Sequence, residues 1–191
     1  MVDGGNGGSG FSGSIEVPSP PGSPGSPGSP VEFLTERGYG PPLCTQFSVF
    51  LDNRVGRLHS LLEVFDGQPI RIVALSVVDA SDYAVVRIVT TRAARARLML
   101  RDERQAYTES ELLVVELGPD QRMTQLSLAL LAAELNIDYA YPLMARPHGA
   151  PTMAVHTDDP VLAGQILHRK GFGLVSETQL HEAVGGDPPI A

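Results

Sequence analysis

Residues 52–58, with the sequence DNRVGRL, carry the side chains best suited to hold a small charged ligand. Asp52 and Asn53 follow a short apolar run, and Gly56 precedes a helical pattern. The first turn of a helix has unpaired N–H groups and a partial positive charge, both of which suit a carboxylate. Glycine allows close approach to the backbone, and aspartate can face an ammonium group. The segment therefore has the chemistry to bind a zwitterion.

The same residue types also serve a purely structural purpose. Asp and Asn readily cap helices and form tight turns, so the segment can equally be a helix cap. The two roles are compatible, because a capped helix start still has neighbouring N–H groups to offer a ligand. The residues alone leave both interpretations open.

Composition limits the other functions. The chain has 191 residues, a net charge of −8 and no dense Lys/Arg cluster, which argues against nucleic acid or an anionic membrane as a partner. Cys44 is the single cysteine, and the five histidines are too scattered for a metal site. No nucleophile motif, phosphate loop or helical pair of carboxylates is present. We expect a non-catalytic cytoplasmic protein without cofactor or metal.

Both ends of the chain differ in composition from the middle. Residues 1–30 are rich in Gly, Ser and Pro, and have too few apolar side chains to offset the entropy cost of ordering. We expect residues 1–45 to be a disordered tail and a transition, and residues 183–191 to be a C-terminal tail.

The middle of the chain alternates between strand and helix patterns. In its first half the patterns predict strands at 46–51, 69–79, 83–90 and towards 108–110, with helices at 58–65 and 92–100. In its second half they predict strands at 111–117, 135–144, 152–157 and 175–180, with helices from 123 and at 158–171. Each half therefore has the order β-α-β-β-α-β.

The second half repeats the first. A shift of 65 residues places Leu58 on Met123, and after a longer loop a shift of 67 places Ile88 on Val155. Such self-similarity indicates a tandem duplication, with one domain at 46–110 and the other at 111–182.

The fold class predicted from this order is α+β, with two ferredoxin-like βαββαβ repeats. Each repeat is a four-stranded antiparallel sheet with two helices on one face. Because open sheets leave unpaired edges, we expect the repeats to pair side by side into one eight-stranded sheet with the helices on one face. The remaining edges also allow a homodimer.

Residues 46–180 resemble a tandem pair of ACT domains. The resemblance rests on the loop at 52–58, on IRIVALSVVD at 70–79, on LNIDYAY at 135–141 and on DDPVLAGQIL at 158–167. It implies a regulatory protein that senses a small molecule, most often an amino acid, at the interface between paired ACT units. In such an interface the loop after the first strand faces the start of the neighbour's second strand.

The ligand-binding residues that this resemblance implies are Asp52, Asn53, Val55, Gly56, Arg57, Leu58, Asn136 and Ile137. Val55 stands where the family usually has proline. In the second copy Gln121 replaces Gly56, so that loop has lost the glycine that would let a ligand approach the backbone. We therefore expect one composite ligand site per chain, with Asn136 facing the first copy's loop. Tyr139 and Tyr141 are expected to pack at the seam between the copies.

These expectations define the predicted function. The chain is expected to bind an amino acid and to signal to an unidentified protein partner, with no role for nucleic acid or membrane. The alternative is a ligand-free interaction or scaffold module. A small enzyme on the ferredoxin-like plan has the least support in the residues.

Overall fold

The computed structural model describes residues 1, 4, 33–35, 38–80 and 82–184. The chain divides into two compact units, Met1–Val31 and Glu32–Ala191, and every described helix and strand lies in the second unit. The elements are β1 (Phe33–Thr35), β2 (Gly38–Gly40), β3 (Cys44–Asp52), α1 (Arg57–Glu63), β4 (Ile72–Asp79), β5 (Tyr83–Thr90), α2 (Ala93–Asp102), β6 (Tyr107–Glu116), α3 (Met123–Leu131), β7 (Ile137–Pro142), β8 (Thr152–Thr157), α4 (Pro160–Arg169), β9 (Gly173–Leu174) and α5 (Glu177–Ala183).

The first copy is an antiparallel sheet in the order β4-β5-β3-β6, with α1 and α2 on one face. Alternate residues of a strand point to opposite faces, so Phe47, Val49 and Leu51 of β3 all face the helices. They are buried there with Leu61 of α1 and Leu100 of α2. The apolar run that predicted β3 therefore also builds the core of this copy.

The second copy repeats this plan in the order β9-β6-β8-β7. Leu113 and Val115 of β6 pack against the apolar faces of α3 and α4, which include Leu126 and Leu167. The predicted α+β class with two βαββαβ-like repeats is confirmed. The predicted strands at 83–90 and 152–157 match β5 and β8 at both ends.

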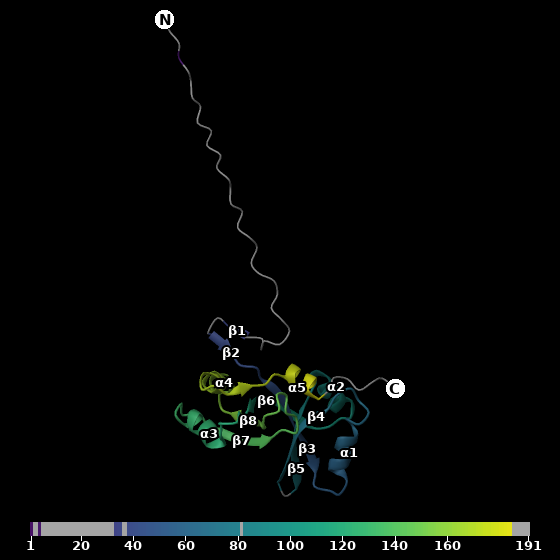
Figure 1. Ribbon diagram of the computed structural model, residues 1–191. Helices are drawn as coiled ribbons and strands as arrows, with labels where there is room; N and C mark the ends of the chain where they lie inside the picture. Colours follow the sequence, from purple (N-terminus) through teal and green to yellow (C-terminus); the bar gives the residue numbers. More distant parts are fainter. Residues whose placement is uncertain (2–3, 5–32, 36–37, 81, 185–191) are drawn as a thin grey trace. The chain divides into compact units, whose positions relative to one another are not determined.

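Strand β6 belongs to both copies, and this corrects the expected strand count. Residues 107–112 pair with β3, whereas residues 113–116 pair with β8 and, at their end, with β9. The sheet therefore has seven strands and not eight, because the last strand of the first copy continues into the first strand of the second. Figure 1 shows β6 between β3 and β8. The predicted domain boundary after residue 110 lies inside this strand.

The predicted strand at 175–180 is wrong. The fourth strand of the second copy is the short β9, and the chain then enters α5. Ser176 caps this helix: its Oγ accepts from the Gln179 N–H at 3.3 Å, and the Gln179 side chain accepts from the Ser176 N–H at 2.9 Å. This reciprocal pair is a capping box, and it starts a helix where the sequence pattern suggested a strand.

The sheet folds back so that its face opposite α1–α4 encloses a second core. Strands β4 and β7 stand at opposite ends of the strand order, yet the Met144 N–H after β7 donates to Val73 O of β4 at 2.8 Å. Cys44, Leu112 and other residues that point away from α1–α4 are buried here together with Leu180 of α5. Four helices thus share one face as expected, and α5 packs against the other.

A short segment before β3 packs on α4. Pro41 is buried against Gly164, where an added Cβ would lie 2.5 Å from Pro41 Cγ. Gln165 Nε2 donates to Tyr39 O at 2.8 Å, and the Tyr39 ring stacks on His168. The predicted disordered tail lies outside the described residues except for Met1 and Gly4, and so does the predicted C-terminal tail except for residues 183–184.

Candidate ligand-binding site

The loop between β3 and α1 is anchored to the β4–β5 turn of its own copy. The Asn53 N–H donates to Asp82 O at 3.5 Å, and Asn53 Nδ2 donates to Asp79 Oδ1 at 3.2 Å. Asp52, the last residue of β3, is exposed. The loop is therefore held at the end of the sheet, with one carboxylate accessible to a cationic group from solvent.

Gly56 starts α1 in a left-handed conformation, with φ 89°, and no side chain caps the helix. A Cβ at this position would meet no atom within 4 Å. The backbone N–H groups of Leu58 and His59 donate no hydrogen bond to any residue that the structure describes. Two donors of the first helical turn are therefore available next to an open position, as a small anionic group requires.

The other predicted residues of the loop differ in their surroundings. Val55 is fully exposed, and Leu58 packs partly against the core of the first copy. Arg57 Nε is shielded from solvent but has no hydrogen-bond partner among the described residues. An unpaired buried donor is unfavourable, and an anionic group at the loop can satisfy it.

In the second copy the equivalent loop is closed by its own side chains. The Gly118 N–H donates to Gln121 Oε1 at 2.9 Å, and Gln121 Nε2 donates to Gly171 O at 2.9 Å. The Arg122 N–H donates to Gln125 Oε1 at 2.8 Å. Gln121 thus fills, with an amide that is paired at both ends, the position that Gly56 leaves open in the first copy.

Two surface hollows border this second loop, and none of the predicted ligand-binding residues lines either of them. One of about 560 Å³ lies beside α3, between Gln125, Leu128 and Phe172. The other, of about 320 Å³, has Glu116 and Asp120 in its wall. The predicted site therefore lies apart from both of these hollows.

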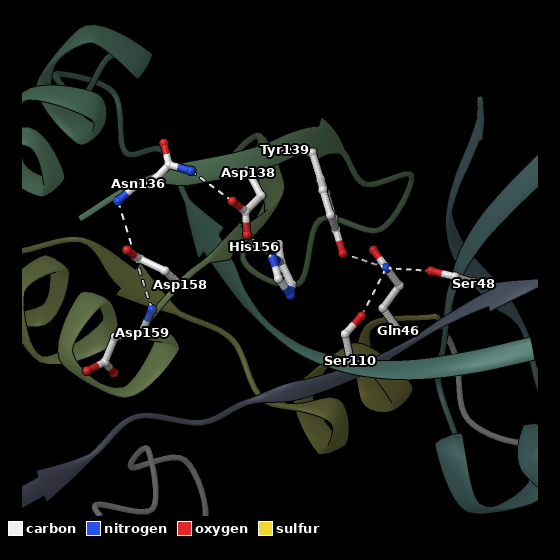
Figure 2. A network of polar contacts seen from close by, with 9 residues as sticks. All are labelled: Gln46, Ser48, Ser110, Asn136, Asp138, Tyr139, His156, Asp158 and Asp159. Carbon is white, nitrogen blue, oxygen red and sulfur yellow. Dashed lines mark hydrogen bonds and ion pairs between the residues drawn. The ribbon is translucent and has the colours of Figure 1, made fainter. Parts of the chain in front are cut away.

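Asn136 and Ile137 lie at the start of β7, where the second copy holds them. The Asn136 N–H donates to Asp158 Oδ1 at 3.2 Å, and Asn136 Nδ2 donates to Asp138 Oδ1 at 2.8 Å (Figure 2). Ile137 packs partly against the core of the second copy. Among the described residues, no hydrogen bond or ion pair joins them to the loop at 52–58. Within a single chain, no polar contact among the described residues therefore links the two parts of the expected site.

The seam between the copies is built around a buried amide, Gln46 of β3. Its Nε2 lies 2.8 Å from Tyr139 Oη and 3.2 Å from both Ser48 Oγ and Ser110 Oγ (Figure 2). Its Oε1 accepts from the Tyr141 hydroxyl at 2.6 Å. The predicted packing of the two tyrosines at the seam is confirmed. Gln46 was not predicted to lie at the seam, although a single amide in an apolar strand is a signal for a buried hydrogen-bonding residue.

Further contacts extend this network from Tyr139 to Asn136. The Tyr139 ring stacks on His156 with centroids 4.7 Å apart, and Arg87 Cζ lies 4.0 Å from the Tyr139 centroid. His156 Nδ1 is 2.9 Å from Asp138 Oδ2, and Asp138 in turn contacts Asn136. Figure 2 shows Asn136, Asp138, Tyr139 and His156 along β7 and β8. The network fixes the two copies against each other.

Burial raises the pKa of the Tyr141 phenol above its ordinary value, and the nearby Tyr139 adds to this effect. The Tyr141 hydroxyl therefore keeps its proton and remains a hydrogen-bond donor to Gln46. The seam depends on this donor, because the Gln46 amide oxygen can only accept.

Two other kinds of site were also sought. Within the part of the chain that the structure describes, no three His, Cys, Asp or Glu side chains gather in a way that could hold a metal ion. Among the described helices, none has the length and apolar content needed to cross a bilayer.

Two solved structures are similar to this chain, and the first of them shares its fold. Protein BT0572 from Bacteroides thetaiotaomicron is 21% identical, with a TM-score of 0.65 over 74% of this chain and 98% of that one. The ligand-free regulatory subunit of aspartate kinase from Thermus thermophilus is 10% identical, with a TM-score of 0.46 over 67% of this chain and 91% of that one. A search of curated proteins gave no match. Residues 43–184 match the family model of the ACT domain pair, and the chain therefore belongs to the ACT domain family.

Proposed function

We propose that this chain is a regulatory protein that binds an amino acid, or a similar small zwitterion, at the β3–α1 loop and signals its presence to a protein partner. The observation that carries the proposal is the uncapped start of α1, where two N–H groups are free beside the left-handed Gly56. Membership of the ACT domain family supports a regulatory role, and the family match indicates no catalytic family.

The chemistry of the loop suits both ends of an amino acid. An α-carboxylate placed at the start of α1 would accept from the N–H groups of Leu58 and His59, and would give the shielded Nε of Arg57 a partner. The exposed carboxylate of Asp52 is available to the α-ammonium group. Val55 and Asn53 border the same loop, so they would meet the ligand's side chain.

The proposed site is completed by a second copy of the chain. Asn136 is exposed at the start of β7, which stands at the end of the strand order. The loop of another chain can approach there and add Asn136, with Ile137 next to it, to the ligand's surroundings. Binding would then favour one arrangement of two chains over another, which is the requirement for a ligand to transmit a signal.

The test is a thermal-shift screen of the full chain against the proteinogenic amino acids, followed by calorimetric titration of any that bind. A ligand at about 100 times its dissociation constant should stabilise the fold by about 2.7 kcal/mol. For a chain of this size, that raises the melting temperature by roughly 5–10 °C. No saturable shift with any amino acid would overturn the proposal and favour the ligand-free interaction module.

A matched pair of glycine variants locates the site. Gly56→Gln places in the first copy the residue that closes the loop of the second, and it should abolish binding. Gly67→Gln is the control, because Gly67 also has positive φ, at 68°, and open space around its Cβ position. Equal loss of affinity in both variants would mean that strain and not the site is responsible. Unchanged affinity in Asn136→Ala would overturn the composite site.

A further inference from the structure

Helix α2 begins without a cap of its own. Its N-cap residue is Arg92, whose side chain accepts no hydrogen bond from the helix, because a guanidinium has no acceptor atom. The shift of 67 residues that relates the two copies places Arg92 on Asp159. Asp159 caps α4 in the usual way, since its Oδ1 accepts from the Leu162 N–H at 2.9 Å. The second copy therefore caps this helix locally, and the first copy does not.

The missing cap is supplied by α5, which follows the last strand of the second copy. The Ala93 N–H of α2 donates to Glu177 Oε1 of α5 at 2.6 Å, across 84 residues of sequence. Beside this contact, Arg92 Nη2 lies 3.0 Å from His181 Nε2. A carboxylate at the start of a helix accepts from a free N–H group and interacts favourably with the helix dipole. Figure 1 shows α5 next to α2, so Glu177 does for α2 what Asp159 does for α4.

The start of α2 in turn holds the start of β4. The Arg71 N–H donates to Thr91 Oγ1 at 3.1 Å, and the Thr91 N–H donates to Arg71 O at 3.0 Å. The second copy has an equivalent contact, in which the Asn136 N–H donates to Asp158 Oδ1 at 3.2 Å. Because Thr91 directly precedes the N-cap residue, a change in the first turn of α2 has a short route to β4, at the end of the strand order.

Helix α5 is held to the rest of the fold by few buried side chains. Among its residues, Glu177–Ala183, which the structure describes in full, Leu180 alone is buried, and it lies in the second core. No element follows α5 in the described part of the chain. Elements with few buried apolar contacts open at a lower free-energy cost than a whole core. Undocking of α5 is therefore an event that both sheets can survive.

We propose that α5 is a strap that caps α2 across the two copies, and that its undocking loosens the start of α2 and, through Thr91, the start of β4. In the docked state Glu177 accepts from the Ala93 N–H, and in the undocked state α2 has no capping side chain. A molecule that binds the two states with different affinity shifts the balance between them and so changes the edge of the first copy. The strap does not depend on the amino-acid site.

The first test is amide hydrogen exchange, followed by NMR on the full chain with Glu177→Ala. The N–H groups of Ala96 and Arg71 report on the starts of α2 and β4, and those of Ala163 and Asn136 are their equivalents in the second copy. Loss of a helix cap should make Ala96 and Arg71 exchange roughly fivefold faster. Ala163 and Asn136 should exchange at the wild-type rate, because the second copy has its own cap.

The matched control is Glu182→Ala, on the same helix. Glu182 is exposed, and its side chain contacts no other described residue, so this variant should change none of the four rates. An unchanged rate at Ala96 in Glu177→Ala would overturn the proposal. Equal acceleration at Ala96 and Ala163 would mean that the whole fold has loosened and would refute a local strap. Faster exchange at Ala96 without a change at Arg71 would overturn the link to β4.

The second test is a rescue, in which Arg92→Asp is added to Glu177→Ala. The aspartate gives α2 the local cap that Asp159 gives α4, so exchange at Ala96 should return to the wild-type rate. The Leu180 N–H, which donates to Ser176 O at 3.0 Å, reports on α5 itself. It should exchange faster than in the wild type with Glu177→Ala and stay fast in the double variant. Failure of the rescue would refute capping as the link, and an unchanged rate at Leu180 would refute undocking.

Discussion

The strongest test of the seam between the two copies is the replacement of Gln46 by leucine. The substitution keeps a similar volume but removes the amide that accepts from the Tyr141 hydroxyl and bonds to Tyr139. Ser48 and Ser110 also lose a partner, but both are only partly buried and can turn to water. The buried Tyr141 hydroxyl is the group that is left unpaired.

The expected loss in the free energy of unfolding comes mainly from that one hydroxyl. A buried polar group without a partner costs about 1–3 kcal/mol, and the lost bond to Tyr139 adds roughly 1 kcal/mol. We therefore expect Gln46→Leu to lower the free energy of unfolding by about 2–4 kcal/mol. Tyr141→Phe should lower it by about 1–2 kcal/mol, because it leaves the Gln46 amide oxygen without its donor.

The double variant separates this explanation from a simple packing defect. Once Gln46→Leu has removed the acceptor, Tyr141→Phe removes the unpaired hydroxyl, so the two effects should be less than additive by about 1–2 kcal/mol. The measurement is urea unfolding followed by circular dichroism, since the chain has no tryptophan. Tyr83→Phe, at a 46% exposed position, is the control and should change little. Strict additivity of the two seam substitutions would refute the reasoning.

Three further outcomes are expected. Gly164→Ala should lower the free energy of unfolding by about 1–3 kcal/mol, because its Cβ would overlap Pro41, and a shift in the urea midpoint measures this. Cys44 should resist a thiol reagent in the native protein and react when it unfolds. Burial raises the pKa of Cys44 from 9.0 to about 12. Between these pH values the unfolded chain loses a proton that the folded chain keeps, so the free energy of unfolding should fall as the pH rises. The melting temperature of Cys44→Ala should fall less than that of the wild type over the same pH range. The hydrogen bond from Arg97 lowers the pKa of Glu109. Glu109→Gln should therefore slightly lower the melting temperature at neutral pH. It should have no such effect in acid, because the wild-type carboxyl is also protonated there.

Local patterns predicted most elements of the fold because their causes are local. Residues 83–90 and 152–157 are short apolar segments rich in β-branched residues, and both became strands with the expected ends. The continuity of β6 was missed because its polar residues, Thr108–Glu111, suggested a break. Those side chains merely alternate between the seam and the helix face, and no Gly or Pro interrupts them. Helix α5 was missed although Ser176 and Gln179 have the spacing of a capping box.

The candidate site likewise has one part that the sequence could predict and one part that it could not. The left-handed Gly56 before a helix follows from its own residue type, so the sequence could predict it. The surroundings of Asn136 depend on which edges of the two copies meet, and this is a tertiary property. The sheet folds back and buries one face of both copies, so β3 contacts Tyr139 and Tyr141 through Gln46. No periodicity along a single strand contains that information.

The shared strand has a consequence for how this pair of domains can evolve. Duplicated domains are usually separate modules that recombination can divide, reorder or delete. A break after residue 110 would deprive the first copy of the residues that pair with Cys44 and Thr45, and would leave the second with a truncated first strand. The second copy would keep residues 113–116, which pair with β8 and β9, so only the first copy would lose part of its sheet. A gene for the first repeat alone would therefore encode a protein with unpaired backbone groups on β3.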